Sequence, residues 1–251
     1  MRLIVQKREI KIKQRNKVIK FLIGSILLLL GFLSAWELYP RTNIHDGVLV
    51  MGLSFLPLVP AFLTDALMPV VANIPKIKRY PIDGGRVHKD GSRILGEGKS
   101  WNGFILGTLA GFGLSVLIFH FIFPYLYNLT EHLFADGKTI LMYMENEEKL
   151  LSFFGIYKHP VKYYLGQFFI ALSAPVGDLI GSYYKRRKKV GRGEVFLFWD
   201  QNDFILLGGL VAWAFFPFTW YHYVFLILMT PILTILFSLL GYLVGLKTHP
   251  W

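Results

Sequence analysis

Long apolar runs constrain this chain more than any other feature of its sequence. Most of them approach the roughly 20 residues that an α-helix needs to cross the hydrocarbon core of a bilayer. A soluble domain carries about 25% charged residues, whereas this chain carries 17%. We therefore predict an all-α membrane protein, a bundle of about six transmembrane helices with two charged cytoplasmic loops. The predicted spans are residues 21–36, 48–72, 103–127, 163–182, 204–220 and 224–246.

The distribution of basic residues predicts the orientation of these spans. The N-terminal segment, loops 73–102 and 183–203 and the C-terminal tail together hold twenty-two Lys and Arg, against four in the alternate loops. Because cytoplasmic loops carry an excess of Lys and Arg, we expect both termini and both basic loops in the cytoplasm. This bias also explains the net charge of +11 without nucleic acid. The chain has no cysteine, which excludes disulfides and thiolate catalysis.

The first basic loop combines glycines with cations directly before a predicted helix. Its segment Gly96-Glu97-Gly98-Lys99-Ser100 leads into the third span. Backbone N–H groups of such a turn bind anions, and Lys99 adds a full charge. Ser100 is expected to cap the helix. A P-loop would need glycine where the sequence has Arg93, so that motif is absent. An ordinary basic loop with turn glycines remains an alternative.

The fourth span carries polar residues on one face. Asp178, Ser182 and Lys185 are spaced so that they share a helix face. An ionised carboxylate within a span costs roughly 2.5–3.5 kcal/mol, so Asp178 should meet a partner or water. The helix then ends in the cation run 185–189, which suits phosphate. The alternatives are a buried interhelix pair for Asp178, and headgroup binding plus topology for the cations.

Two further carboxylates, Asp200 and Asp203, stand where the fifth span begins. Helix capping would account for either one. Together with Asp178 from the neighbouring helix, they would instead offer the oxygen ligands that Mg²⁺ prefers. Three aspartates beside two basic loops predict a site for a metal-bound polyphosphate.

Both loops resemble the CDP-archaeol synthases, an archaeal family within the phosphatidate cytidylyltransferase superfamily. YPIDGGRVHKDGSRILGEGKSWNGF is similar to the family pattern PIDxGr…DGrRiLGdGKTwrGf. GDLIGSYYKRRKKVGRGE and DQNDF are similar to GDllgSfiKRR…G and DQxDF. The resemblance covers roughly residues 48–250, with Glu97 and Ser100 where the family usually has Asp and Thr.

The resemblance implies transfer of a cytidylyl group from CTP to an isoprenoid glycerol ether phosphate, 2,3-bis-geranylgeranylglyceryl phosphate, with release of pyrophosphate and Mg²⁺ as cofactor. The expected partners are CTP and this lipid in a membrane-embedded protein without nucleic acid; a homodimer is one option that the sequence leaves open. We expect residues 1–47 to form a basic segment with an additional helix. Residues 48–251 would form a five-helix catalytic domain with an outer-loop insertion near 128–161.

With the resemblance, roles can be assigned to individual residues. The expected catalytic residues are Asp178, Lys185, Asp200 and Asp203, and the three aspartates would ligate Mg²⁺. The expected substrate-binding residues are Asn73, Asp83, Arg86, Gly96, Gly98, Lys99, Ser182, Arg186, Arg187 and Gln201.

Two other functions compete with this interpretation. A transporter or channel for an anionic lipid or ion also carries intramembrane carboxylates, but here the charges gather on one side of the membrane. A CDP-alcohol phosphotransferase would need the pattern DGxxAR…GxxxDxxxD, which the sequence lacks.

Overall fold

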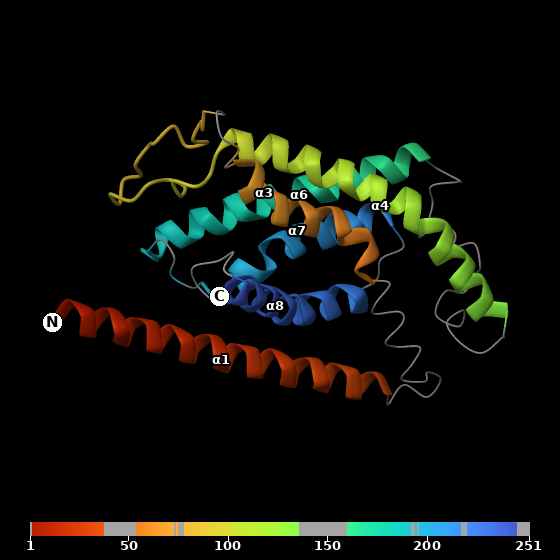
Figure 1. Cartoon of the computed structure of the whole chain (residues 1–251), viewed down its shortest axis with the longest axis horizontal. Helices are drawn as coiled ribbons and strands as arrows, with labels where there is room; N and C mark the ends of the chain where they lie inside the picture. The colour runs from red at the N-terminus through yellow and green to blue at the C-terminus, as the bar shows by residue number, and fades with distance from the viewer. Residues whose placement is uncertain are drawn as a thin grey trace.

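The protein is a bundle of helices with no β-strand in the described part of the chain. A computed structural model describes residues 2–37, 54–72, 74, 78–135, 160–191, 194, 196–216 and 220–244. A 3₁₀ turn, Leu56–Leu58, leads into the second of the helices shown in Figure 1. These helices are α1 (Arg2–Glu37), α3 (Val59–Ala72), α4 (Trp101–Ala135), α6 (Pro160–Arg187), α7 (Trp199–Phe215) and α8 (Trp220–Leu243).

The helices occupy the predicted spans, which confirms an all-α membrane protein. Four described segments are long and apolar enough to cross a bilayer: Ile12–Ser34, Trp101–Phe121, Pro160–Arg187 and His222–Leu243. The second predicted span corresponds to the shorter apolar helix Leu56–Ala72, and its first residues lie outside the described part. The fifth corresponds to α7, which has 17 residues.

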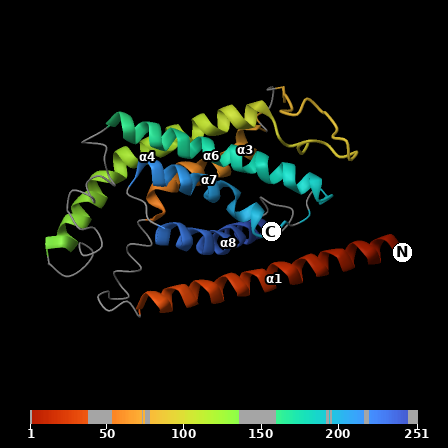
Figure 2. The same ribbon diagram turned by 180° about the vertical axis from the view of Figure 1, so that it is seen from behind.

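Helix α1 is longer than the sequence suggested. It has 36 residues, which at 1.5 Å each give a length of about 54 Å, well beyond a hydrocarbon core of about 30 Å. Its basic first half therefore projects past the bilayer as a continuous helix. Figures 1 and 2 both show α1 beside α8 at the edge of the bundle. Leu29, Phe32 and Leu33 join it to the core.

Glycines allow two helix pairs to pack closely, because residues without a side chain at every fourth position let helix backbones approach each other. In α4, a β-carbon added at Gly107 would lie 2.6 Å from Met68 Cγ of α3. In α6, a β-carbon added at Gly177 would lie 2.7 Å from the carbonyl carbon of Asp203 in α7. The second contact sets where the carboxylates of α6 and α7 lie relative to each other.

The centre of the bundle is formed by α3, α6 and α7, with α8 against α7. Its fully buried large side chains include Leu58, Ile170, Phe204, Ile205 and Leu226. The start of α1, loop 78–100, the end of α6 and the start of α7 all lie at one end of the molecule (Figures 1 and 2). The two basic loops of the sequence are thereby brought to the same end.

Candidate active site

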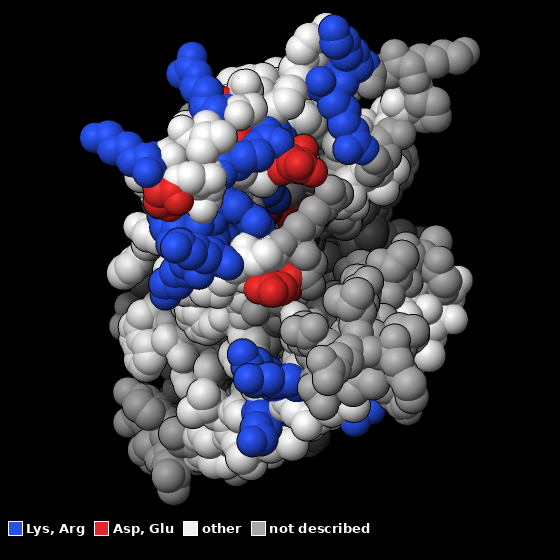
Figure 3. All heavy atoms as spheres, turned by 90° about the vertical axis from the view of Figure 1, so that its left-hand side faces the viewer, with Lys and Arg blue, Asp and Glu red and all other residues white. Residues whose placement is uncertain are grey.

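A cavity of about 690 Å³ lies between the glycine-rich loop, the end of α6 and the start of α7. Figure 3 shows this end of the molecule, where Lys and Arg side chains gather around a hollow with acidic side chains among them. Nine of the predicted site residues line the cavity: Gly96, Gly98, Lys99, Asp178, Ser182, Lys185, Arg186, Asp200 and Asp203.

Loop 78–100 folds back on itself to form one wall of this cavity. The N–H of Ile82 donates to the carbonyl of Lys99 over 3.0 Å, and the N–H of Trp101 donates to the carbonyl of Tyr80 over 2.9 Å. Ser100 then caps α4, because its Oγ accepts the N–H of Gly103 at 3.2 Å. This cap was predicted from the sequence and is confirmed.

Asp83 holds the loop together from within. Its side chain is 1% exposed and accepts hydrogen bonds from the guanidinium of Arg93 (2.7 Å) and from the N–H groups of Gly85 (2.9 Å) and Leu95 (3.1 Å). Burial by itself raises the pKa of Asp83. The hydrogen bonds and the charge of Arg93 together lower it by more than burial raises it, so the pKa lies below its ordinary value. Asp83 therefore stabilises the loop and does not reach the cavity.

Lys99 and Asp178 form an ion pair in the wall of the cavity. The Lys99 ammonium contacts both carboxylate oxygens of Asp178. Lys99 belongs to the glycine loop and Asp178 to the middle of α6, so the contact joins the two segments that the sequence singled out. Both side chains are partly exposed, at 24% and 29%, and remain accessible to a ligand.

A second ion pair joins Lys185 near the end of α6 to Asp200 in the first turn of α7. The Lys185 ammonium lies 2.9 Å and 2.7 Å from the two carboxylate oxygens. Asp200 also accepts the N–H of Phe196 at 3.1 Å, which fixes the turn before α7. Asp200 therefore has a structural partner as well as a position on the cavity wall.

Asp203 lies against Gly181 of α6. Its Oδ2 would lie 3.1 Å from a β-carbon added at Gly181, and its charge interacts with those of Asp178 and Asp65. Among the described residues, no group of three or more His, Asp and Glu side chains is close enough to hold a metal ion. The three aspartates expected to ligate Mg²⁺ therefore do not form one cluster in the described structure, because Asp200 pairs with Lys185.

The other predicted residues that the structure describes do not line the larger cavity. Asn73 lies outside the described residues. Arg86 is exposed on the loop, and its carbonyl accepts the N–H of Ile94 at 3.1 Å. Gln201 is buried at 8% exposure within α7. Arg187 donates hydrogen bonds to Asp90 and to the carbonyl of Arg93 in the glycine-rich loop.

A smaller cavity of about 330 Å³, which the sequence did not reveal, adjoins the first. Asp178, Lys99 and Gly98 line both cavities, so the Lys99–Asp178 pair lies in their shared wall. Most of the other residues that line the smaller cavity have apolar side chains, and two, Asp65 and Arg79, are charged. Its remaining lining residues are Asp65, Met68, Pro69, Ala72, Arg79, Ile82, Ser100, Gly103, Phe104, Pro175 and Leu179.

Arg79 and Asp65 had no assigned role in the sequence. Arg79 Nε donates to the carbonyl of Ala72, the last residue of α3, over 2.9 Å. That bond holds the guanidinium at the cavity. Asp65 was noticeable as a charged residue in an apolar span, and this is the signal that would have pointed to the smaller cavity.

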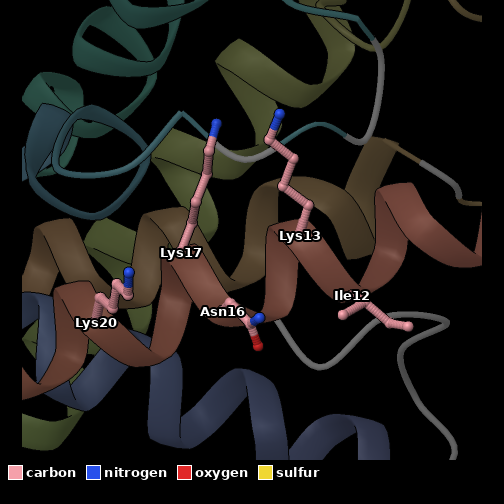
Figure 4. A pocket seen from close by; sticks show the side chains of 5 residues that line it. All are labelled: Ile12, Lys13, Asn16, Lys17 and Lys20. Carbon is pink, nitrogen blue, oxygen red and sulfur yellow. The ribbon is translucent and has the colours of Figure 1, made fainter.

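A separate cavity of about 470 Å³ lies along α1. Lys13 and Lys17 extend in the same direction from the helix, with Lys20 further along and Ile12 and Asn16 nearby (Figure 4). The lysines are exposed, and they stand where α1 enters its apolar span. Positive charges at this position suit the membrane interface.

Comparisons with known proteins agree with the two motifs. The family model described as "CarS-like: CDP-archaeol synthase" matches residues 49–251. The CDP-archaeol synthase of Thermococcus kodakarensis is 30% identical over 198 residues, covering 79% of this chain and 95% of the relative. That of Methanosarcina barkeri is 30% identical over 201 residues, covering 77% of this chain and 100% of the relative.

One solved structure, described as an intramembrane enzyme for archaeal membrane lipid biosynthesis, is similar over 81% of this chain and 96% of that chain, with 26% identity and a TM-score of 0.49. The family match covers well over half of the sequence and includes every residue that lines the two adjoining cavities. The chain therefore belongs to the CarS-like CDP-archaeol synthase family.

Proposed function

We propose that this protein transfers a cytidylyl group from CTP to 2,3-bis-geranylgeranylglyceryl phosphate and releases pyrophosphate. The observation that carries the proposal is the Lys99–Asp178 pair in the wall between two cavities: a larger one lined by the basic loop and the cations at the end of α6, and a smaller one whose lining combines apolar side chains with a few charged ones. A reaction between a water-soluble nucleotide and a lipid phosphate needs two such compartments that meet at the reacting phosphorus.

The larger cavity suits the triphosphate of CTP. Lys185 and Arg186 line it from α6, Lys189 lines it from the turn after α6, and Lys99 lines it from the loop. The Nε of Arg186 is buried and has no hydrogen-bond partner among the described residues. Buried donors without partners are costly, and a phosphate oxygen would satisfy this one.

The smaller cavity suits the lipid phosphate. Met68, Phe104 and Leu179 give it an apolar lining, and they come from α3, α4 and α6. Arg79 supplies a cation at its edge. A phosphate bound there would have its isoprenoid chains among apolar helices, where they belong.

The two compartments support direct displacement at phosphorus. An oxygen of the lipid phosphate attacks the α-phosphorus of CTP, the bond from that phosphorus to the bridging oxygen breaks, and pyrophosphate leaves. Lys99 at the shared wall would stabilise charge on the phosphorus that is attacked. Lys185 and Arg186 would offset the charge that develops on the departing pyrophosphate.

The carboxylates of the larger cavity also fit Mg²⁺ as a cofactor, with two protein ligands instead of the three aspartates that the sequence suggested. Asp178 and Asp203 interact electrostatically on one cavity wall, and Mg²⁺ is commonly held by one or two carboxylates plus substrate phosphates. We propose these two as its protein ligands, with Asp200 mainly ordering Lys185. When bound, Mg²⁺ would neutralise phosphate charge and act as a Lewis acid.

The active site is proposed to lie on the cytoplasmic side, because the basic segments gather at one end of the bundle. Residues 48–251 would form the catalytic domain, with α1 as an addition. Cysteine accessibility in sealed vesicles tests the orientation, since the native chain has no cysteine. A homodimer stays a prediction, to be tested by the mass of the purified protein in detergent.

The central experiment incubates purified protein with labelled CTP, Mg²⁺ and candidate lipid phosphates, and then extracts the lipid. Label in the organic phase, dependent on the unsaturated archaeal ether phosphate, is the expected result. Label that stays in the aqueous phase with every lipid would refute the proposal. Vesicle flux tests the transporter alternative, which the family membership does not favour; a synthase should show none.

A further inference from the structure

Arg187, the last residue of α6, connects that helix to the glycine-rich loop. Its Nη1 donates to Asp90 Oδ1 over 3.2 Å, and its Nη2 donates to the carbonyl oxygen of Arg93 over 2.7 Å. Its guanidinium carbon also lies 5.2 Å from the centre of the Tyr183 ring, one turn earlier on α6. Both Nη atoms of Arg187 are thus engaged. Its Nε is buried without a hydrogen-bond partner among the described residues, as in Arg186, but unlike Arg186 it is not among the described residues that line the larger cavity.

Both partners of Arg187 are themselves fixed within the loop. Asp90 Oδ1 accepts the N–H of Ser92 at 3.0 Å across the turn at Gly91, which has a φ of +80°. Arg93 is anchored at its other end, because its guanidinium donates to the buried Asp83 over 2.7 Å. A restraint on Asp90 and Arg93 therefore reaches Leu95 through the Asp83 hydrogen bonds.

These anchored residues lie beside the cavity wall. Ser92, Arg93, Leu95, Gly96, Glu97, Gly98 and Lys99 all line the larger cavity. The wall thus starts two residues after Asp90 and ends at the lysine that contacts Asp178. Holding Asp90 and Arg93 against α6 fixes the distance between this wall and the cations of α6 on the opposite side.

We propose that Arg187 is a positioning residue that clamps the glycine-rich loop onto α6 and does not itself bind substrate phosphate. The proposal rests on the proposed function only in taking the larger cavity as the CTP site. The clamp needs a planar fork of donors, since one side chain has to reach a carboxylate and a backbone carbonyl at once. A lysine could replace an arginine as a point charge for phosphate, but its shorter side chain has one nitrogen for the two acceptors that separate Nη atoms of Arg187 bond, so we expect it to hold the loop less well.

The test compares Arg187→Gln, Arg187→Lys, Asp90→Asn and the double variant Arg187→Gln/Asp90→Asn. Lys188→Gln is the matched control, because it removes the next cation on the chain, whose ammonium lies 5.4 Å from the Phe196 ring and does not line the cavity. The measurements are kcat and the KM for CTP, and hydrogen–deuterium exchange of peptides covering residues 86–96 in the ligand-free protein.

The clamp predicts that all three single variants change the same quantities in the same direction. The two Arg187 variants should raise the KM for CTP about tenfold, and Asp90→Asn should raise it less because the bond to the Arg93 carbonyl stays. Each variant should change kcat by less than about threefold and speed exchange in residues 86–96. The double variant should be no worse than Arg187→Gln alone, because Arg187→Gln already removes the contact with Asp90. Lys188→Gln should stay within about twofold of the wild type.

Direct phosphate binding by Arg187 predicts a different pattern. Arg187→Lys would then keep most of the affinity for CTP, Asp90→Asn would be neutral, and exchange in the loop would not change; any of these results overturns the clamp. Unchanged exchange in α4 and α8 separates a released loop from a misfolded protein. If the wild type makes no CDP-lipid, the proposed function fails, and the exchange comparison still decides the clamp.

Discussion

Lys99 and Asp178 are 79 residues apart in the sequence, yet the ammonium of one contacts both carboxylate oxygens of the other. The pair joins the glycine-rich loop to α6 at the wall that the two cavities share. A bound phosphate would replace the Asp178 carboxylate as the anion beside Lys99. A bound metal ion would replace the Lys99 ammonium as the cation beside Asp178.

Removing the carboxylate should stop catalysis without unfolding the protein. We expect Asp178→Asn to lower the rate of CDP-lipid formation at least about a hundredfold, because it weakens the proposed Mg²⁺ site and leaves Lys99 without its counter-charge. Membrane insertion and the melting temperature of the purified protein should stay close to wild type. Turnover at the wild-type rate would show that Asp178 is not part of the reaction.

Lys99 should matter through its position and not only through its charge. Lys99→Gln is expected to raise the KM for CTP and lower kcat, together costing about a hundredfold or more in kcat/KM. Lys20→Gln on α1 is the matched control, since it removes a lysine that lies outside both adjoining cavities. Equal effects of the two substitutions would mean that net charge, and not the site, determines activity.

Filling the smaller cavity should separate the two substrates. Leu179→Trp adds bulk to a residue that lines only that cavity. It should raise the KM for the lipid phosphate about tenfold or more, with CTP binding, measured by calorimetry, nearly unchanged. Leu165→Trp makes the same change at an exposed position of α6 and should have little effect. Loss of CTP affinity in Leu179→Trp would contradict the assignment of the smaller cavity to lipid.

Gly177 should tolerate no side chain, because α7 lies directly against it. Gly177→Ala places a methyl group 2.7 Å from the Asp203 carbonyl carbon, so α7 must move and Asp203 with it. We expect a loss of about 1–3 kcal/mol in stability together with weaker Mn²⁺ binding in the presence of CTP, measured by electron paramagnetic resonance. Gly113→Ala in α4 meets nothing within 4 Å and is the control.

The loop should open in acid through Asp83. Since folding lowers the pKa of Asp83 below its ordinary value of 3.8, the contribution of this group to stability is present above that value and is lost as the pH falls through the folded pKa. Amide exchange at Gly85 and Leu95, corrected for intrinsic rates, should therefore rise below about pH 3.8. Asp83→Asn should exchange fast at every pH; a pH step that persists in this variant would assign the effect to another group.

Much of the fold could be predicted because its determinants are local. A run of apolar residues marks a membrane helix whatever its neighbours are. Glycines at every fourth position, such as Gly103 and Gly107 in α4 or Gly177 and Gly181 in α6, are likewise a local feature that favours close helix contact. Ser100 was identified as a cap for the same reason, since a cap acts within one turn. The length of α1 was underestimated because hydropathy detects the membrane core and not the helix that continues into water.

Individual side-chain roles depended on contacts between distant segments. Arg187 and Lys185 are two residues apart in one cation run, but one bonds to the loop and the other to α7. The sequence predicted Asp83 as a substrate-binding residue, whereas its buried carboxylate bonds to groups within the loop. Sequence spacing could not distinguish these cases, because it does not say which partner each charge finds.

The sequence by itself determined that this chain is a helical membrane protein with two basic, glycine- and aspartate-bearing segments of CDP-archaeol synthase type, since composition, period and motif are properties of short stretches. Only the tertiary structure decided that Asp178 faces Lys99, that Asp200 turns away to Lys185, and that two cavities share one wall. Those relationships arise from helices packing across the bundle, where the close contacts at glycine set which charges meet.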